Sequence, residues 1–336
     1  MTIPEYQERD ARFFEQELHG FLPHRIIDCH THIGLREHLG FLSEQRRREM
    51  WALDVSQELT VEQLNDWNAR LFPRRETQAC AFGWPIRECD LESSNAYVAR
   101  CAPQLRAAFL VTDPHWPAEK VRELVLQGGF TGLKPYPDLA GDSASSEAAI
   151  PDYFPESHQA LAEALGLVVM LHLPRRERLR DPRNLAEVRA MAHARPTVPL
   201  IIAHIGRAYT MSFAEGSLHQ LADLANVYFD FAANLNAEVI ALCLREVGAA
   251  RMLYGSDLPI GLMRGRREHR GDEYINYTDG DYVWNNNRRP PEVEATYTLF
   301  IYEQLRAFRC AAEEVGLSAD DLVSIFSGNF ERLLPP

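Results

Sequence analysis

Two histidines two residues apart, His30 and His32, give the strongest chemical signal in the sequence. They end an apolar segment, IIDCHTHIG, whose composition is typical of a β-strand. Residues two apart on a strand point to the same face, so both imidazoles can bind one metal ion. The same alternation predicts Asp28 on the histidine face, with Cys29 and Thr31 on the opposite face. The alternative is a histidine pair that only hydrogen-bonds the end of a strand.

Three further apolar segments end in residues of the same chemistry: His172 in LVVMLHLP, His204 in PLIIAHIGR and Asp257 in RMLYGSDLP. A lone histidine at a strand end is usually a hydrogen-bonded structural residue. Four histidines and an aspartate at the ends of four strands are better explained by one shared metal site. Imidazole and carboxylate ligands without thiolates suit zinc, and manganese, iron or cobalt fit the same set.

The segments that position these residues are short and β-rich, and each is followed by a stretch of helical periodicity such as PAEKVRELVLQGG or SHQALAEALG. This alternation predicts a parallel sheet with crossover helices. Eight such units predict a closed (β/α)8 TIM barrel with its active site at the carboxyl ends of the strands. An open doubly wound sheet is the alternative, but the glycine-rich dinucleotide motif is missing after the first strand. The predicted strands are 24–33, 78–84, 105–113, 130–136, 167–174, 199–206, 227–234 and 251–257.

The length of 336 residues favours one elaborated domain over residues 1–336. Two connections, 34–77 and 258–291, are far longer than usual and are predicted to be binding loops or lids. The first is expected to contain helical pieces. Aromatic residues of the second can close over a ring-bearing substrate, or pack against the barrel or a partner subunit: Tyr274, Tyr277, Tyr282 and Trp284.

Composition excludes several functions. The chain has 35 basic and 48 acidic residues, and its net charge of -13 disfavours nucleic acids and anionic membranes as partners. Six scattered cysteines without a Cys-x-x-Cys pair argue against a disulfide framework and a thiolate zinc site. The N-terminal residues show no leader pattern, and no segment is long and apolar enough for a membrane span. We therefore expect a cytoplasmic protein that acts on a small molecule.

The motifs IDCHTHIG, GLKPYP, HLP, AHIGR, YGSDLP and SGNFERLL, in this order, resemble those of the amidohydrolase superfamily. The resemblance spans nearly the whole chain. It is strongest to the amidohydrolase-related (family 2) branch, which includes hydrolases and enzymes like aminocarboxymuconate-semialdehyde decarboxylase, and it implies a homo-oligomer, a dimer or larger. It also implies that one divalent metal ion is bound by His30, His32, His172 and Asp257. His204 would then lie beside the ion and polarise the substrate, and Asp257 would also act as general base.

Three residues are predicted to contact the substrate: Lys134, Tyr136 and Arg207. In two-metal relatives a lysine on the fourth strand can become carboxylated and bridge the ions, but GLKPYP resembles the mononuclear branch. Lys134 is therefore expected to be a structural or substrate-contacting cation. Arg207 is the best placed of the arginines near the mouth to hold a carboxylate. Further candidates at the mouth are Asp113, His115, Asp230, Arg175, Arg176 and the arginines of MRGRREHR.

The expected reaction is hydrolysis of an amide, lactone or other ester by a metal-activated water. The alternative is metal-dependent, non-oxidative decarboxylation of an aromatic or unsaturated carboxylic acid, because such decarboxylases are similar in the same motifs. A barrel that binds a ligand without catalysis is the third hypothesis, and the complete ligand set argues against it.

Overall fold

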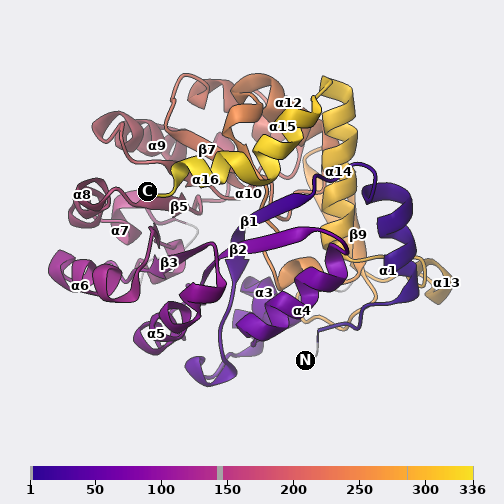
Figure 1. Cartoon of the computed structure of the whole chain (residues 1–336), viewed down its shortest axis with the longest axis horizontal. Helices are drawn as coiled ribbons and strands as arrows, with labels where there is room; N and C mark the ends of the chain where they lie inside the picture. Colours follow the sequence, from indigo (N-terminus) through magenta and orange to yellow (C-terminus); the bar gives the residue numbers. More distant parts are fainter. Residues whose placement is uncertain (1–2, 142–146, 286, 336) are drawn as a thin grey trace.

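The computed structural model describes residues 3–141, 147–285 and 287–335 (Figure 1). Eight strands pair in parallel and in chain order, from β1 to β8. Hydrogen bonds between the first and last strand segments complete the circle: Asp257 N–H donates to the His30 carbonyl at 2.9 Å, and His32 N–H to the Leu258 carbonyl at 3.0 Å. The predicted (β/α)8 barrel is therefore confirmed. The strands are β1 Arg25–His32, β2 Glu76–Phe82, β3 Ala107–Val111, β4 Gly132–Lys134, β5 Val168–Leu171, β6 Leu200–Ile202, β7 Val227–Asp230 and β8 Met252–Leu253.

Helices cover the outside of the barrel, and the stretches predicted from helical periodicity are among them. Their apolar faces pack on the strands because residues three and four apart lie on one side of a helix. Helices α6 and α8 end at Gly129 and Gly166, whose φ angles of 65° and 63° lie in the left-handed region that glycine adopts at low cost. The main outer helices are α4 Val61–Leu71, α5 Leu91–Cys101, α6 Ala118–Gly128, α8 Glu156–Leu165, α9 Pro182–Ala194, α12 Ala237–Val247 and α14 Phe300–Val315.

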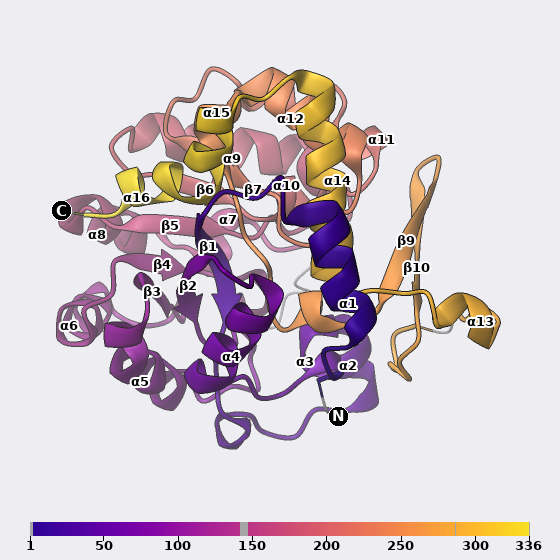
Figure 2. The same ribbon diagram turned by 45° about the vertical axis from the view of Figure 1, so that its right-hand side comes forward.

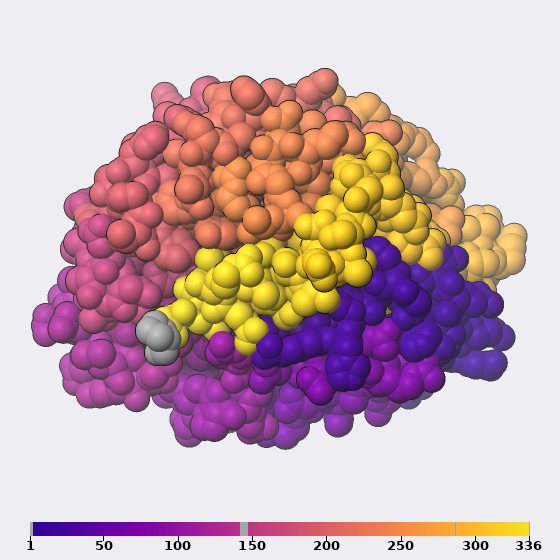
Figure 3. All heavy atoms as spheres, turned by 45° about the horizontal axis from the view of Figure 1, so that its top comes forward, coloured from indigo at the N-terminus to yellow at the C-terminus, as the bar shows by residue number. Residues whose placement is uncertain are grey.

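The amino-terminal end of the barrel is closed by the C-terminal segment. Glu331, in helix α16 (Asn329–Leu333), pairs at 2.7 Å with Arg25, the first residue of β1. Figure 3 shows this segment in yellow, lying across the surface next to the indigo N-terminal residues. Inside the barrel, side chains such as Ile27, Phe109 and Met170 form a buried apolar cluster. The opposite end of the barrel, where the carboxyl ends of the strands lie, holds the candidate active site.

Both long connections contain regular structure. The first holds α2 (Glu44–Glu49) and α3 (Trp51–Val55), followed by α4, as predicted. The second forms an antiparallel hairpin of β9 (Gly265–Arg270) and β10 (Glu273–Thr278), which projects from the barrel in Figure 2. Trp51 stacks on Trp284 with ring centroids 4.6 Å apart, so the two connections touch over the barrel mouth. Among the described residues, no helix combines the length and apolar character of a membrane span.

Candidate active site

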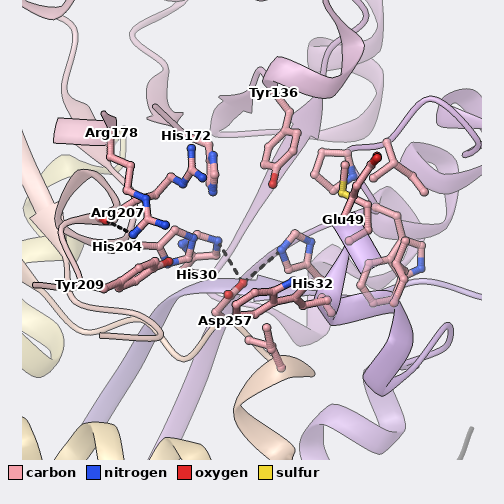
Figure 4. Close-up of a pocket in the computed structure, with 18 of the residues that line it drawn as sticks. His30, His32, Glu49, Tyr136, His172, Arg178, His204, Arg207, Tyr209 and Asp257 are labelled. Carbon is pink, nitrogen blue, oxygen red and sulfur yellow. Dashed lines mark hydrogen bonds and ion pairs between the residues drawn. The ribbon is translucent and has the colours of Figure 1, made fainter. Parts of the chain in front are cut away.

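A cavity of about 280 Å³ opens at the carboxyl ends of the strands (Figure 4). Its floor is formed by residues at the ends of strands, and its rim by side chains of the two long connections, including Trp51 and Tyr274. Of the residues predicted to bind metal or substrate, all but Lys134 line this cavity: His30, His32, Tyr136, His172, His204, Arg207 and Asp257.

Three of these residues form a compact group of metal-binding atoms. Asp257 Oδ1 lies 3.6 Å from His30 Nε2 and 3.4 Å from His32 Nε2. Two ligand atoms on one tetrahedral zinc ion are about 3.3 Å apart, because each lies about 2.0–2.1 Å from the metal. The spacing of the group therefore fits a single ion.

The histidine pair reaches the cavity through an irregularity in β1. Asp28 pairs with Ala79 and Thr31 with Ala81, so β1 carries one extra residue between these pairs, and such a bulge reverses the alternation of faces. The prediction that Asp28 shares the histidine face is therefore wrong. Cys29 instead packs inside the barrel, and the Asp28 carboxylate accepts a hydrogen bond from the Thr31 hydroxyl at 2.6 Å.

Two of the histidines, His32 and His204, are oriented by backbone carbonyls that lie close to their Nδ1 atoms. Nδ1 of His32 lies 3.2 Å from the Gly83 carbonyl, and Nδ1 of His204 lies 3.0 Å from the Ala232 carbonyl. A carbonyl only accepts hydrogen bonds, so Nδ1 of each ring carries a proton, and the neutral tautomer that this geometry selects has its lone pair on Nε2. This is the tautomer in which histidine binds a metal through Nε2.

Asp230, at the end of β7, organises two of the histidines. Its Oδ2 lies 2.9 Å from His30 Nδ1, while its Oδ1 accepts the backbone N–H groups of His204 at 2.8 Å and Ala232 at 3.0 Å. Although burial raises the pKa of Asp230, His30 and His204 together lower it below its ordinary value, so the carboxylate is ionised. Asp230 was among the further candidates, and this geometry fits a support for His30 and His204.

The ionisation states at neutral pH suit metal binding. Burial, followed by the charge of Lys134, lowers the pKa of His30 to about 4. Burial and the charge of Arg207 lower the pKa of His172 well below its usual value. Burial would raise the pKa of Asp257, but the neighbouring imidazoles lower it below its ordinary value. The two histidines are therefore neutral and Asp257 is charged, as metal ligands must be.

Left-handed backbone is concentrated in this region. The φ angles are 58° at His204, 64° at Arg207 and 56° at Asp257, where non-glycine residues are uncommon. Such conformations persist only where the surrounding structure holds them, and they gather at functional sites. At His204 the chain turns out of β6, which therefore ends at Ile202 rather than at the predicted residue 206. The β8 strand ends early as well, at Leu253, and Asp257 lies in the following turn.

His172 and Lys134 lie differently from the compact group. The His172 ring is 5.3 Å from the His204 ring and 4.8 Å from the Tyr136 ring, so it is in the cavity, but it is not part of the three-atom group around Asp257. Lys134 is fully buried, and its Nζ has no hydrogen-bond partner among the described residues. Burial lowers the pKa of Lys134 to about 8, an effect opposed by Asp230 and Asp257. The roles of both residues stay predictions.

Several of the further candidates from the sequence lie outside the cavity or are bound to other residues of the chain. Asp113 and His115 pair with each other at 3.0 Å outside this cavity, Arg175 pairs with Glu187, and Arg176 is exposed. Four residues that also line the cavity belong to no motif in the sequence and were not predicted: Glu49, Trp84, Arg178 and Tyr209. Arg178 follows two other arginines in HLPRRERLR, and only the fold distinguishes it from them.

A parallel eight-stranded barrel with histidine and aspartate side chains gathered at the carboxyl ends of its strands has the architecture of a barrel enzyme. The family model described as amidohydrolase matches residues 27–335, and the chain therefore belongs to the amidohydrolase family, whose members are metal-dependent enzymes. No curated protein sequence matches the chain.

Solved structures with the same fold include enzymes of several kinds. An amidohydrolase from Burkholderia multivorans with bound zinc has a TM-score of 0.58 at 15% identity, over 92% of this chain and 99% of that one. A 2,6-dihydroxybenzoate decarboxylase with bound 2,6-dihydroxybenzoate has a TM-score of 0.54 at 15% identity, over 93% and 99%. The 4-oxalomesaconate hydratase of Rhodopseudomonas palustris has a TM-score of 0.55 at 16% identity, over 92% and 95%. At these identities the likeness shows a shared fold and leaves the reaction open.

Proposed function

We propose that the protein is a metal-dependent hydrolase that acts on an amide, lactone or other ester of a small, carboxylate-bearing molecule. The observation that carries the proposal is the group of His30 Nε2, His32 Nε2 and Asp257 Oδ1, whose separations of 3.6 and 3.4 Å from the carboxylate suit one ion. Membership of a metal-dependent family supports it.

We propose that His30, His32, His172 and Asp257 hold one divalent ion, with zinc preferred and manganese, iron or cobalt as alternatives. When bound, such an ion supplies Lewis acidity that lowers the pKa of a coordinated water. Asp257 is ionised at neutral pH, so its carboxylate can accept the proton of the attacking water. His204 is held through its Nδ1–H, so its Nε2 lone pair can receive a proton, and the imidazolium formed in this way can donate that proton to the substrate.

Asp230 is expected to act on the ion through His30. The Asp230→Asn variant should bind zinc about 10- to 100-fold more weakly, because losing a carboxylate partner on Nδ1 weakens a histidine ligand by this much. Competition with a chromogenic chelator measures the affinity. Asp113→Asn is the matched control, since Asp113 pairs with a histidine outside the cavity. Equal zinc affinity of the two variants would show that Asp230 does not strengthen His30 as a zinc ligand.

Arg207 is the proposed partner of a substrate carboxylate, with Tyr136 beside it in the cavity wall. Its Nη1 donates to the Leu173 carbonyl at 3.0 Å, which fixes the guanidinium, and burial lowers its pKa. We expect Arg207→Met to raise KM for carboxylate-bearing substrates by about 10- to 100-fold, the effect of losing a charge-assisted hydrogen bond. The KM for neutral substrates should stay unchanged. Equal increases for both kinds of substrate would contradict this assignment.

The second candidate function is decarboxylation of an aromatic or unsaturated carboxylic acid. The cationic Arg207 in the cavity favours an acid as substrate, and the fold is shared with 2,6-dihydroxybenzoate decarboxylase. In this reaction the bond between the substrate carbon and its carboxylate breaks, a proton is added to that carbon, and carbon dioxide leaves. His204 would supply the proton.

One experiment separates the two reactions. The zinc-loaded protein is incubated in ¹⁸O-labelled water with a panel of lactones, amides and aromatic carboxylates, and the products are analysed by mass spectrometry. Hydrolysis places ¹⁸O in the organic product and releases no carbon dioxide. Carbon dioxide release with no label in the organic product would overturn the hydrolase proposal in favour of the decarboxylase.

A further inference from the structure

A second cavity adjoins the first on its outer side. It has a volume of about 420 Å³ and shares Trp51, Arg178 and Tyr274 with the wall of the inner cavity. Phe213 and Trp284 line only the outer cavity. Neither the predicted metal ligands nor Arg207 belong to it, so it is a separate space that begins where the inner one ends.

Arg178 stands at the boundary without a counter-ion. Its neighbours Arg175 and Arg180 pair with Glu187 at 3.2 Å and Glu177 at 2.5 Å. By contrast, no carboxylate of the described residues lies within 4.0 Å of the Arg178 guanidinium. Among the described residues, the one hydrogen bond of this guanidinium is a long one of 3.5 Å to the Arg207 carbonyl. The acidic residues of the outer cavity, Asp272 and Glu273, are exposed residues of the hairpin.

The other charges around Arg178 are positive. Figure 4 shows Arg178 on the same side of the inner cavity as Arg207. Arg267 is buried, and its guanidinium lies 4.7 and 4.6 Å from the ring centroids of Tyr209 and Tyr274, the rings that Arg178 also contacts. It donates to Asn276 Oδ1 and to the Ala233 carbonyl, both at 2.8 Å. Three guanidinium groups thus lie close together in a chain whose net charge is -13. Like charges at close range repel each other, and an anion placed among them relieves the repulsion.

Aromatic rings surround the boundary. The guanidinium of Arg178 lies 4.8 Å from the ring centroid of Phe213 and 5.3 Å from those of Tyr209 and Tyr274. On the other side, Trp284 stacks between Trp51 and Tyr282, with interplanar angles of 12° and 6°. Trp51, Trp284 and Tyr274 are all half-buried, so part of each ring is free to contact a ligand. Because the stack occupies both faces of Trp284, a planar aromatic ligand can meet these rings edge to face, an arrangement that aromatic pairs favour.

We propose that the outer cavity is a second binding subsite, in which Arg178 pairs with a carboxylate carried by a planar aromatic or conjugated part of the substrate. That part packs against the exposed edges of Trp284 and Trp51, while the bond that reacts lies in the inner cavity. The role of this subsite in catalysis rests on the proposed function. The binding itself needs neither a metal ion nor turnover, so it can be tested alone.

The probe is 2-naphthoate, a planar aromatic carboxylate, titrated calorimetrically into the full-length, chelator-treated protein. We expect the neutral isostere 2-naphthamide to bind at least about 10-fold more weakly, and Arg178→Met to weaken 2-naphthoate binding by about the same factor. Trp284→Leu should weaken it by about 5-fold, because one aromatic contact is lost. Arg176→Met is the matched control, since Arg176 is exposed in the same segment, and should bind like the wild type.

Each of three results would overturn the inference. One is equal binding of 2-naphthoate by the Arg178→Met and Arg176→Met proteins. Another is loss of binding in Arg207→Met with no change in Trp284→Leu, which would place the probe in the inner cavity. If Arg178→Met fails to fold, equal affinity of wild-type protein for 2-naphthoate and 2-naphthamide also overturns it. Failure of the ¹⁸O experiment alone leaves these measurements unaffected, so the two proposals fail separately.

Discussion

The Asp257→Asn variant is expected to turn over substrate about 1,000-fold more slowly than the wild type while keeping its fold. Asparagine has nearly the same shape as aspartate, but its amide cannot accept a proton at neutral pH, and a positioned general base contributes about 10²- to 10⁴-fold. The carboxylate is well placed for this loss to be large. It lies 3.4 Å from His32 Nε2, and the neighbouring imidazoles lower its pKa so that it is ionised in the wild type.

The measurement is kcat on whichever substrate of the ¹⁸O panel the wild type converts. Zinc content and circular dichroism of the variant establish that the loss does not come from an empty or unfolded site. Asp113→Asn again serves as the control, and its kcat should match that of the wild type. A kcat of Asp257→Asn within about threefold of the wild type would exclude Asp257 as the base.

Removal of the metal is expected to abolish turnover and to reduce stability. A ligand that binds only the folded state at 1,000 times its Kd stabilises that state by about 4 kcal/mol. Dialysis against a chelator should therefore lower the free energy of unfolding by about this amount relative to the zinc-saturated protein. Re-addition of zinc should restore both the stability and the turnover.

Urea unfolding of the zinc-saturated and chelated proteins measures the stability difference, and product formation is followed on the same samples. Asp230→Asn provides a graded comparison, because its weaker zinc binding should give a smaller stabilisation at equal zinc concentration. Full turnover by protein shown to contain no metal would contradict the proposed chemistry.

The barrel and the positions of the site residues could be predicted because apolar strand segments and strand-end polar residues are local patterns. The segments ending at His172 and His204 each show an apolar run that the following polar residue interrupts. In a parallel barrel such ends meet at one mouth, so the pattern along the chain becomes a cluster in space. Membership of the amidohydrolase family agrees with the resemblance of the motifs.

Other features depended on contacts that no local pattern contains. The bulge in β1 reflects its pairing with β2, and it moved Asp28 away from the histidine face. The turn at His204 needs φ angles of 58° and 50° at His204 and Ile205, and a positive φ is rare for a β-branched residue such as Ile205. The hairpin of β9 and β10 carries many charged residues and has one strand pair, so its alternation is a weak signal. Arg178 became distinct from Arg175 only when the fold gave Arg175 a carboxylate partner.

The most direct test of the metal-centre proposal is elemental analysis of the protein after zinc reconstitution and dialysis, comparing the wild type with a variant that combines His30→Ala and His172→Ala. The account predicts about one ion per wild-type chain and none in the double variant, because two of the four proposed ligands are gone. Two ions per wild-type chain would contradict the mononuclear site and would make Lys134 a candidate bridging ligand. No bound ion in the wild type after reconstitution would contradict the metal centre itself.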